Sequence, residues 1–238
     1  MARQKFRATD NRADMATTFK SGETTAMQEA LQALFEADPD LREARAVAGA
    51  LPDRRREPGF EILMLLIIEQ QVSIASARAI WARVKAGIPQ ISPEAVLALS
   101  DEDLRGFGLS RPKVRYCRAL AQSVSEGSLS LQDLPELPDQ EAMAALTTVT
   151  GIGRWTAEVY LLFSLGRRDI FPAGDVALQA AAMDIKKLPD RPSEKDLYAI
   201  AEQWRPHRGV AAQLLWRYYG VTRGRADPVS VEDVKLEA

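Results

Sequence analysis

Two glycines stand one residue apart in the segment Leu146-Thr147-Thr148-Val149-Thr150-Gly151-Ile152-Gly153-Arg154-Trp155-Thr156-Ala157, directly before a stretch with helical character. Glycine lets the backbone turn tightly and brings its N–H groups close to an anion. The N-terminus of the following helix adds a partial positive charge that favours phosphate. Ile152, the apolar residue between the glycines, can pin such a turn to the core. The pattern predicts a helix-hairpin-helix, which holds a DNA backbone without reading its bases.

A lone acid follows the hairpin at the end of the segment Phe171-Pro172-Ala173-Gly174-Asp175. Pro172 and Gly174 indicate a loop, and Asp175 stands where the next helical pattern begins. The helix dipole and the free N–H groups at such a position favour the ionised carboxylate. Two interpretations remain open from these residues alone. Asp175 is either a plain helix cap or a carboxylate that stabilises positive charge in a reaction.

The composition is that of an ordinary globular chain of 238 residues, with 46% hydrophobic and 27% charged residues. This length predicts one large domain or two closely packed subdomains. The longest apolar run, Ile62 to Ile68, is too short to span a bilayer. No stretch near the N-terminus has the apolar character of a secretory signal, so we expect a cytoplasmic protein that does not associate with membranes. Cys117 is the only cysteine, which excludes a disulfide and a cysteine-rich metal or iron–sulfur site.

Apolar residues recur at spacings of three and four through most of the chain, which predicts helices. We expect helices over 26–37, 39–48, 60–69, 74–85, 92–99, 101–107, 112–125, 141–148, 156–165, 176–185, 194–203 and 210–219. Ser92 and Ser100 are expected N-caps, and Pro93 suits a first helical position. No segment shows sustained alternation of apolar and polar residues, so we expect no sheet. The predicted fold class is all-α.

The net charge of −2 argues by itself against DNA binding, but the distribution of charge is uneven. Two segments contain basic residues and no acid. Their basic residues are Arg105, Arg111, Lys113, Arg115 and Arg118 in the first, and Arg205, Arg208, Arg217, Arg223 and Arg225 in the second. Either run alone is equally well explained as a solvated helix face. Together with the hairpin, they favour contact with phosphates.

Four spaced motifs in this chain resemble those of the helix-hairpin-helix DNA glycosylases, the HhH-GPD superfamily. The motifs are Glu69-Gln70-Gln71-Val72-Ser73, Gly151 to Ala157, Phe171 to Asp175, and Trp204-Arg205-Pro206-His207-Arg208 through Trp216. The resemblance covers roughly Pro58 to Gly220 and is strongest to the 3-methyladenine DNA glycosylase II branch. It implies two interleaved helical subdomains over 25–226, with a base pocket in the cleft between them. Residues 1–24 would be a flexible arm and residues 227–238 an acidic tail.

The resemblance also implies roles for individual residues. Asp175 would be catalytic, because a departing base leaves an oxocarbenium-like sugar whose positive charge a carboxylate stabilises. The predicted base pocket consists of Trp155, Trp216, Phe60 and Arg208. Two further pocket positions, aromatic in one relative, are Val159 and Val176 here. Aromatic faces attract the cationic ring of an alkylated purine, and the two valines leave the range of lesions open.

For DNA binding, the resemblance implies backbone contacts from the hairpin and a side chain that fills the gap left by the flipped base. The predicted DNA-binding residues are Gly151, Gly153, Thr156, Gln71 and Ser73, with Gln71 in the gap-filling position. A plain interhelical turn and a plain helix end remain the alternatives for the hairpin and the glutamines. No cofactor is expected to be required, although a structural Na⁺ or K⁺ is implied at the carbonyls of Thr147, Val149 and Ile152.

Relatives that also cleave the DNA strand carry at the position of Trp155 a lysine that forms a Schiff base with the sugar. Tryptophan cannot do this, and no lysine occurs between Lys113 and Lys186. We therefore expect a monofunctional, monomeric DNA glycosylase of base excision repair that acts on alkylated purines in double-stranded DNA and associates with the nucleoid. Two alternatives remain: the same fold acting on hypoxanthine, ethenoadenine, uracil or an oxidised purine, and a non-catalytic protein that only binds damaged DNA.

Overall fold

The computed structural model describes residues 23–224, and within them every regular element is a helix. The elements are α1 (Thr25–Ala37), α2 (Pro39–Ala48), α3 (Phe60–Glu69), α4 (Ile74–Gly87), α5 (Pro93–Ala98), α6 (Asp101–Gly106), α7 (Arg111–Ser125), α8 (Asp139–Thr147), α9 (Arg154–Phe163), α10 (Val176–Ile185), α11 (Glu194–Ala201), the 3₁₀ turn η1 (Glu202–Trp204) and α12 (Arg208–Thr222). The predicted all-α class is confirmed. None of these helices is long and apolar enough to cross a membrane.

Capping side chains fix several helix starts. Ser92 accepts a hydrogen bond from the Ala95 N–H, as the sequence predicts. Ser100 and Asp103 form a reciprocal capping box at the start of α6. These bonds satisfy N–H groups that have no partner inside the helix.

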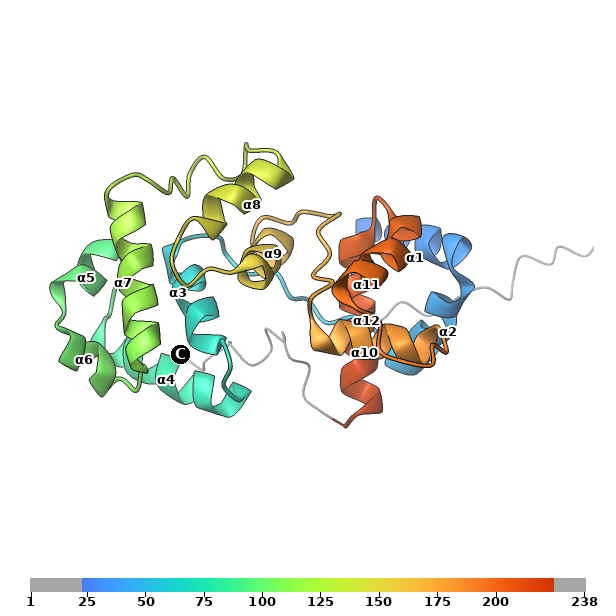
Figure 1. Cartoon of the computed structure of the whole chain (residues 1–238), viewed down its shortest axis with the longest axis horizontal. Helices are drawn as coiled ribbons and strands as arrows, with labels where there is room; N and C mark the ends of the chain where they lie inside the picture. The colour runs from blue at the N-terminus through green and yellow to red at the C-terminus, as the bar shows by residue number, and fades with distance from the viewer. Residues whose placement is uncertain (1–22, 225–238) are drawn as a thin grey trace, which may run out of the picture.

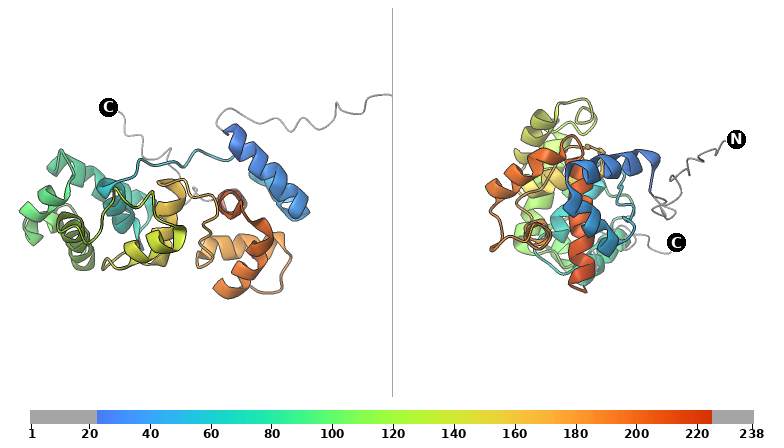
Figure 2. Two further views of the ribbon diagram at one scale, coloured as in Figure 1. Left: turned by 90° about the horizontal axis from the view of Figure 1, so that it is seen from above. Right: turned by 90° about the vertical axis from the view of Figure 1, so that its right-hand side faces the viewer.

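The helices form two lobes that interleave in sequence (Figure 1). Helices α3 to α9 make the first lobe, in which α3 packs against α4, α7 and α9. Helices α1 and α2 pack instead with α10 and α12 in the second lobe. Figure 2 shows the same separation from above. The chain therefore crosses between the lobes twice, once after α2 and once after α9.

One largely buried helix occupies the centre of each lobe. In α3, seven of the ten residues are buried, all except Glu61, Ile62 and Glu69, as expected for a helix that is apolar on nearly every face. In α12, every position from Gly209 to Trp216 is buried. At Gly209 a side chain would lie 2.8 Å from the carbonyl oxygen of Arg168, so only glycine permits this close approach.

The folded domain begins earlier than residue 25. The Glu23 carboxylate accepts hydrogen bonds from Arg45 and from the Leu51 N–H, and Thr24 caps α1. These two residues, which the sequence assigns to the arm, belong to the second lobe. Residues 1–22 of the expected arm and the expected tail over 227–238 lie outside the described residues.

Candidate DNA interface and active site

The predicted hairpin connects α8 to α9 and is anchored in the core. Val149 and Ile152 are each 3% exposed, so the apolar residue between the glycines does pin the turn. Gly151 has φ +99°, and its Cα lies against the ring of Tyr116, where any side chain would collide. Gly153 begins α9 without a side-chain cap, which leaves the first N–H groups of that helix available to an anion.

The turn between α3 and α4 lies directly beside the hairpin. The Gln70 side-chain amide donates to the Gly151 carbonyl at 2.9 Å and to the Thr156 hydroxyl at 3.0 Å. Thr156 is itself buried, so its side chain supports the hairpin from within. Gln70, which the sequence treats as a helix-end residue, therefore joins the two predicted DNA-binding segments.

Gln71 projects from the same turn with a left-handed backbone, φ +55°. This conformation is uncommon for a residue other than glycine and is enriched at functional sites, although Lys187 also adopts it. Val72, next to it, is an exposed apolar side chain that the sequence did not single out. Ser73 caps α4 by accepting from the Ser76 N–H. The predicted gap-filling position is thus exposed and held in a defined geometry.

A hollow of about 760 Å³ lies between these two segments. Its lining comprises Glu69, Gln70, Gln71, Tyr116, residues 147–153, Trp155 and Thr156. The hollow brings together all the predicted DNA-binding residues except Ser73. The three carbonyls predicted to bind a cation belong to residues of this lining, and that of Val149 already accepts from the Ile152 N–H.

Asp175 caps α10 and is half-buried. Its Oδ1 accepts from the N–H groups of Ala177 and Leu178 at 2.8 and 3.0 Å. Its Oδ2 accepts from the indole Nε1 of Trp155 at 2.8 Å. The cap predicted from the sequence is confirmed, and the indole of Trp155 joins the capped carboxylate to the rim of the hollow. Asp175 itself does not line that hollow.

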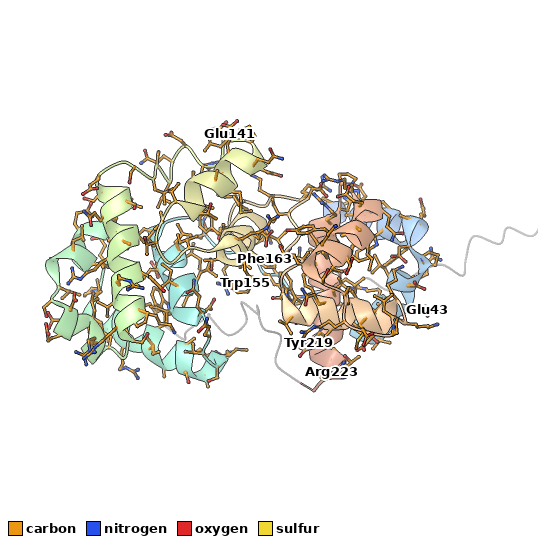
Figure 3. All side chains as sticks on the ribbon, viewed as in Figure 1. Glu43, Glu141, Trp155, Phe163, Tyr219 and Arg223 are labelled. Carbon is orange, nitrogen blue, oxygen red and sulfur yellow. The ribbon has the colours of Figure 1, made fainter. Side chains whose placement is uncertain are left out.

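Trp155 and Asp175 come from different lobes. Trp155 stands in the first turn of α9, and Figure 3 shows it and Phe163 where the two lobes meet. Asp175 begins α10 of the second lobe. The hydrogen bond between them therefore crosses the junction, and its geometry depends on how the lobes are placed.

The prediction that Trp216 lines the base pocket requires a correction. It is 0% exposed, with the Arg54 guanidinium 5.5 Å from its ring centroid and the Phe163 ring 5.7 Å away. The reason is its place on α12, the central helix of the second lobe. In this structure Trp216 is a core residue packed against Arg54 and Phe163.

Arg54 is a residue near the site that sequence reasoning missed. It is 1% exposed and lies over the rings of both Phe163 and Trp216. Burial, followed by the charges of Arg217 and Arg56, lowers the pKa of Arg54 to about 9, whereas the Asp175 carboxylate opposes that shift. Asp175 therefore has a cation within electrostatic reach. Only the run of arginines over 54–56 could have suggested this from the sequence.

The other two predicted pocket residues have structural partners. Phe60 is buried at the start of α3, next to Gly59, whose N–H donates to the Tyr160 hydroxyl. Arg208 binds Asp169 with two hydrogen bonds of 2.9 Å. It thereby fixes the start of α12 to the segment that leads to Asp175, and neither residue lines the hollow.

Most members of the second basic run bind acids or carbonyls of the described chain, which argues against the phosphate contact expected of this run. Arg205 and Arg208 pair with Asp169, and Arg223 pairs with Asp184. Arg217 donates to the Ala48 carbonyl. Asp169 and Asp184 lie in distant segments and so could not be seen within the run, whereas Glu202, which also pairs with Arg205 and Arg208, stands directly before it. Arg225 lies outside the described residues.

The first basic run divides into two groups. Lys113 is buried and donates to the Ile68 carbonyl, and Arg118 pairs with Asp101. Arg105, Arg111 and Arg115 are exposed. Arg115 lies over the ring of Tyr116 at 5.2 Å, beside the hollow. This group remains suited to phosphate contact.

Residues 64–207 match the family model described as "HhH-GPD superfamily base excision DNA repair protein". A Bacillus subtilis protein, YfjP, named provisionally as a DNA-3-methyladenine glycosylase, is 33% identical over 168 residues, which are 66% of this chain. The chain spans 58% of the length of that relative.

Two solved structures are similar over most of their length. One is the 3-methyladenine DNA glycosylase Mag1 of Schizosaccharomyces pombe in complex with abasic DNA, with a TM-score of 0.73, 27% identity, and coverage of 84% of this chain and 98% of that one. The other is a DNA-3-methyladenine glycosidase of Bacillus halodurans, with a TM-score of 0.72, 32% identity, and coverage of 86% and 94%.

Proposed function

Since the chain belongs to the HhH-GPD superfamily of base excision DNA repair proteins, we propose that it is a monofunctional DNA glycosylase. Its substrate is double-stranded DNA containing alkylated purines of the 3-methyladenine and 7-methylguanine type, and its product is an abasic site. The names of the relatives support this substrate class. We further propose that it acts as a monomer.

The observation that carries the proposal is the Trp155–Asp175 hydrogen bond beside the hollow between the hairpin and the α3–α4 turn. The hairpin and the α3–α4 turn hold the strand on either side of the hollow. A nucleotide rotated out of the duplex next to Gln71 then reaches Trp155, whose ring offers a stacking face to a cationic purine. The same residue brings the base next to the carboxylate.

Asp175 supplies the electrostatic part of the reaction. The sugar becomes cationic as the bond to the base breaks, and a fixed carboxylate stabilises that charge without having to reorganise. Three of the roughly four acceptor positions of a carboxylate are taken by Ala177, Leu178 and Trp155. The remaining position on Oδ2 can accept a hydrogen bond from the attacking water. A cationic base leaves readily, so no acid is needed to protonate it.

The absence of strand cleavage follows from the side chains at this point. Trp155 cannot form a Schiff base. Lys113 is buried, with its amine donating to the Ile68 carbonyl at 2.7 Å. The protein therefore hydrolyses the glycosidic bond and leaves the backbone intact.

The test is to identify the bases released from duplex DNA treated with a methylating agent. We expect 3-methyladenine and 7-methylguanine to appear with the wild-type protein and the DNA strand to remain uncut until alkali is added. Release of only hypoxanthine, ethenoadenine, uracil or an oxidised purine from matched duplexes would show that the protein is a DNA glycosylase that acts on another base. Tight binding to these duplexes without release of any base would show that the protein binds damaged DNA but is not an enzyme.

A further inference from the structure

A three-residue cluster links the two lobes next to the Trp155–Asp175 pair. It consists of Arg154 and Glu158 on α9 and Tyr198 on α11. The Tyr198 hydroxyl donates to Glu158 Oε1 at 2.7 Å and accepts from Arg154 Nη2 at 2.6 Å. Arg154 Nε also donates to Glu158 at 2.9 Å. One phenol thus bonds to both residues of α9.

Tyr198 also contacts the segment that carries the catalytic carboxylate. Its ring meets the ring of Phe171 edge to face, with 6.5 Å between the centroids. Phe171 stands four positions before Asp175 and packs on Trp204 as well. Arg154 stands one position before Trp155. Tyr198 therefore lies between the segment leading to Asp175 and the helix turn that holds Trp155.

The burial of Glu158 favours a single arrangement of this three-residue cluster. The Glu158 side chain is 4% exposed, and burial raises the pKa of Glu158, whereas the hydrogen bonds from Tyr198 and Arg154 lower it. Burial and the neighbouring Glu158 raise the pKa of Tyr198 to about 12, so its hydroxyl remains a donor at physiological pH. A buried carboxylate that loses one of its donors is costly, so the cluster favours one arrangement of the two helices.

We propose that Tyr198 is a positioning residue, which holds the segment of Asp175 in register with Trp155 so that the carboxylate faces the base delivered by the hairpin. The proposal rests on the function proposed above. Tyr198 does not line the hollow. Its effect on the reaction passes through the Trp155–Asp175 hydrogen bond, which crosses the same junction.

The first test compares Tyr198→Phe with wild type in single-turnover base release at saturating protein. Removal of the hydroxyl keeps the ring against Phe171, so the fold is retained. We expect the rate to fall on the order of 10- to 100-fold, as a misplacement of about 1 Å does. We expect the Kd for a duplex containing an abasic-site analogue to stay within about threefold. Tyr218→Phe, on α12, is the matched control and should leave both values unchanged.

A second measurement does not require activity. The chain has four tryptophans, so ¹⁵N-tryptophan labelling gives four indole N–H signals, and Trp155→Phe identifies that of Trp155. We expect Tyr198→Phe to shift this signal and to speed its hydrogen exchange, with the other three unchanged. An unchanged Trp155 signal would overturn the proposal, as would weaker abasic-DNA binding at an unchanged rate. If wild type releases no base, the proposed function fails, whereas the indole signal still decides the role of Tyr198.

Discussion

The indole nitrogen of Trp155 lies 2.8 Å from Oδ2 of Asp175, across the junction of the two lobes. The side chain expected to stack on the base is therefore also a hydrogen-bond donor to the carboxylate expected to stabilise the sugar cation. This bond fixes the ring and the carboxylate relative to each other before DNA binds. Recognition of the base and the chemistry at the sugar then depend on the same two residues.

Asp175→Asn removes the charge but keeps a residue that caps helices well. We expect single-turnover release of 3-methyladenine to fall by about 10²- to 10³-fold, as when one preorganised electrostatic group is lost. The Kd for abasic-analogue DNA should change little, since the hairpin is untouched. Release at the wild-type rate would show that the charge of Asp175 has no part in the reaction.

Trp155→Phe keeps an aromatic face and deletes the indole donor. A hydrogen bond to a charged group is worth about 1.5–3 kcal/mol, so we expect the single-turnover rate to fall by roughly tenfold or more. Trp81→Phe, in α4, is the control and should leave the rate unchanged. Equal rates for Trp155→Phe and wild type would show that the bond to Asp175 has no part in the reaction.

Gln70→Ala deletes the side-chain amide that joins the α3–α4 turn to the hairpin. Two lost hydrogen bonds correspond to about 1–2 kcal/mol. We expect the free energy of unfolding and the free energy of DNA binding each to weaken by this amount. The measurements are thermal unfolding and the Kd for undamaged duplex, which should weaken by roughly tenfold for every sequence tested. Gln32→Ala, on the exposed side of α1, is the matched control.

Gly151→Ala tests the geometry of the hairpin. The position has φ +99°, and a Cβ would lie 2.3 Å from the Tyr116 ring. We expect a loss of about 1–3 kcal/mol in the free energy of unfolding, together with weaker DNA binding. Gly106→Ala has open space around it and should cost little. Equal effects of the two substitutions would contradict the assigned turn.

Cys117 provides a pH-dependent prediction. Burial raises the pKa of this thiol from 9.0 to about 12. Because the folded-state pKa is the higher one, the stability that the neutral thiol contributes is complete below pH 9 and is lost as the pH rises from 9 through 12. The free energy of unfolding of wild type should therefore fall relative to Cys117→Ala above pH 9. At pH 8 a thiol reagent should modify the protein only after denaturation.

The helices could be predicted from the sequence because their signals are local. Ser92 and Ser100 act within three residues of themselves, and apolar spacing fixes the buried face of each helix. The glycines of the hairpin and the acid after the Pro–Gly loop are local as well. Helix starts were therefore accurate to within about two residues at most elements, as expected for capped helices.

Contacts between distant segments could not be predicted in this way. The Trp155–Asp175 bond joins residues 20 apart, and the Tyr198–Glu158 bond joins residues 40 apart. Trp216 was expected on a pocket wall because its position follows a motif, but its burial is set by the packing of α12 against α2 and α10. Arg54 lies in a linker with no periodicity, and the run of arginines over 54–56 does not indicate that one of them lies over the rings of Phe163 and Trp216.

The pairing of α1 and α2 with α12 has a consequence for synthesis of the chain. A ribosome completes α1 and α2 first and α12 last among these helices, and domains tend to fold as they emerge. The segment from α3 to α9 can assemble while the earlier helices still lack their partner. The sides of α1 and α2 that pack on α12 therefore lack their partner until α12 has been synthesised, and we expect this apolar surface to be open to chaperones during translation.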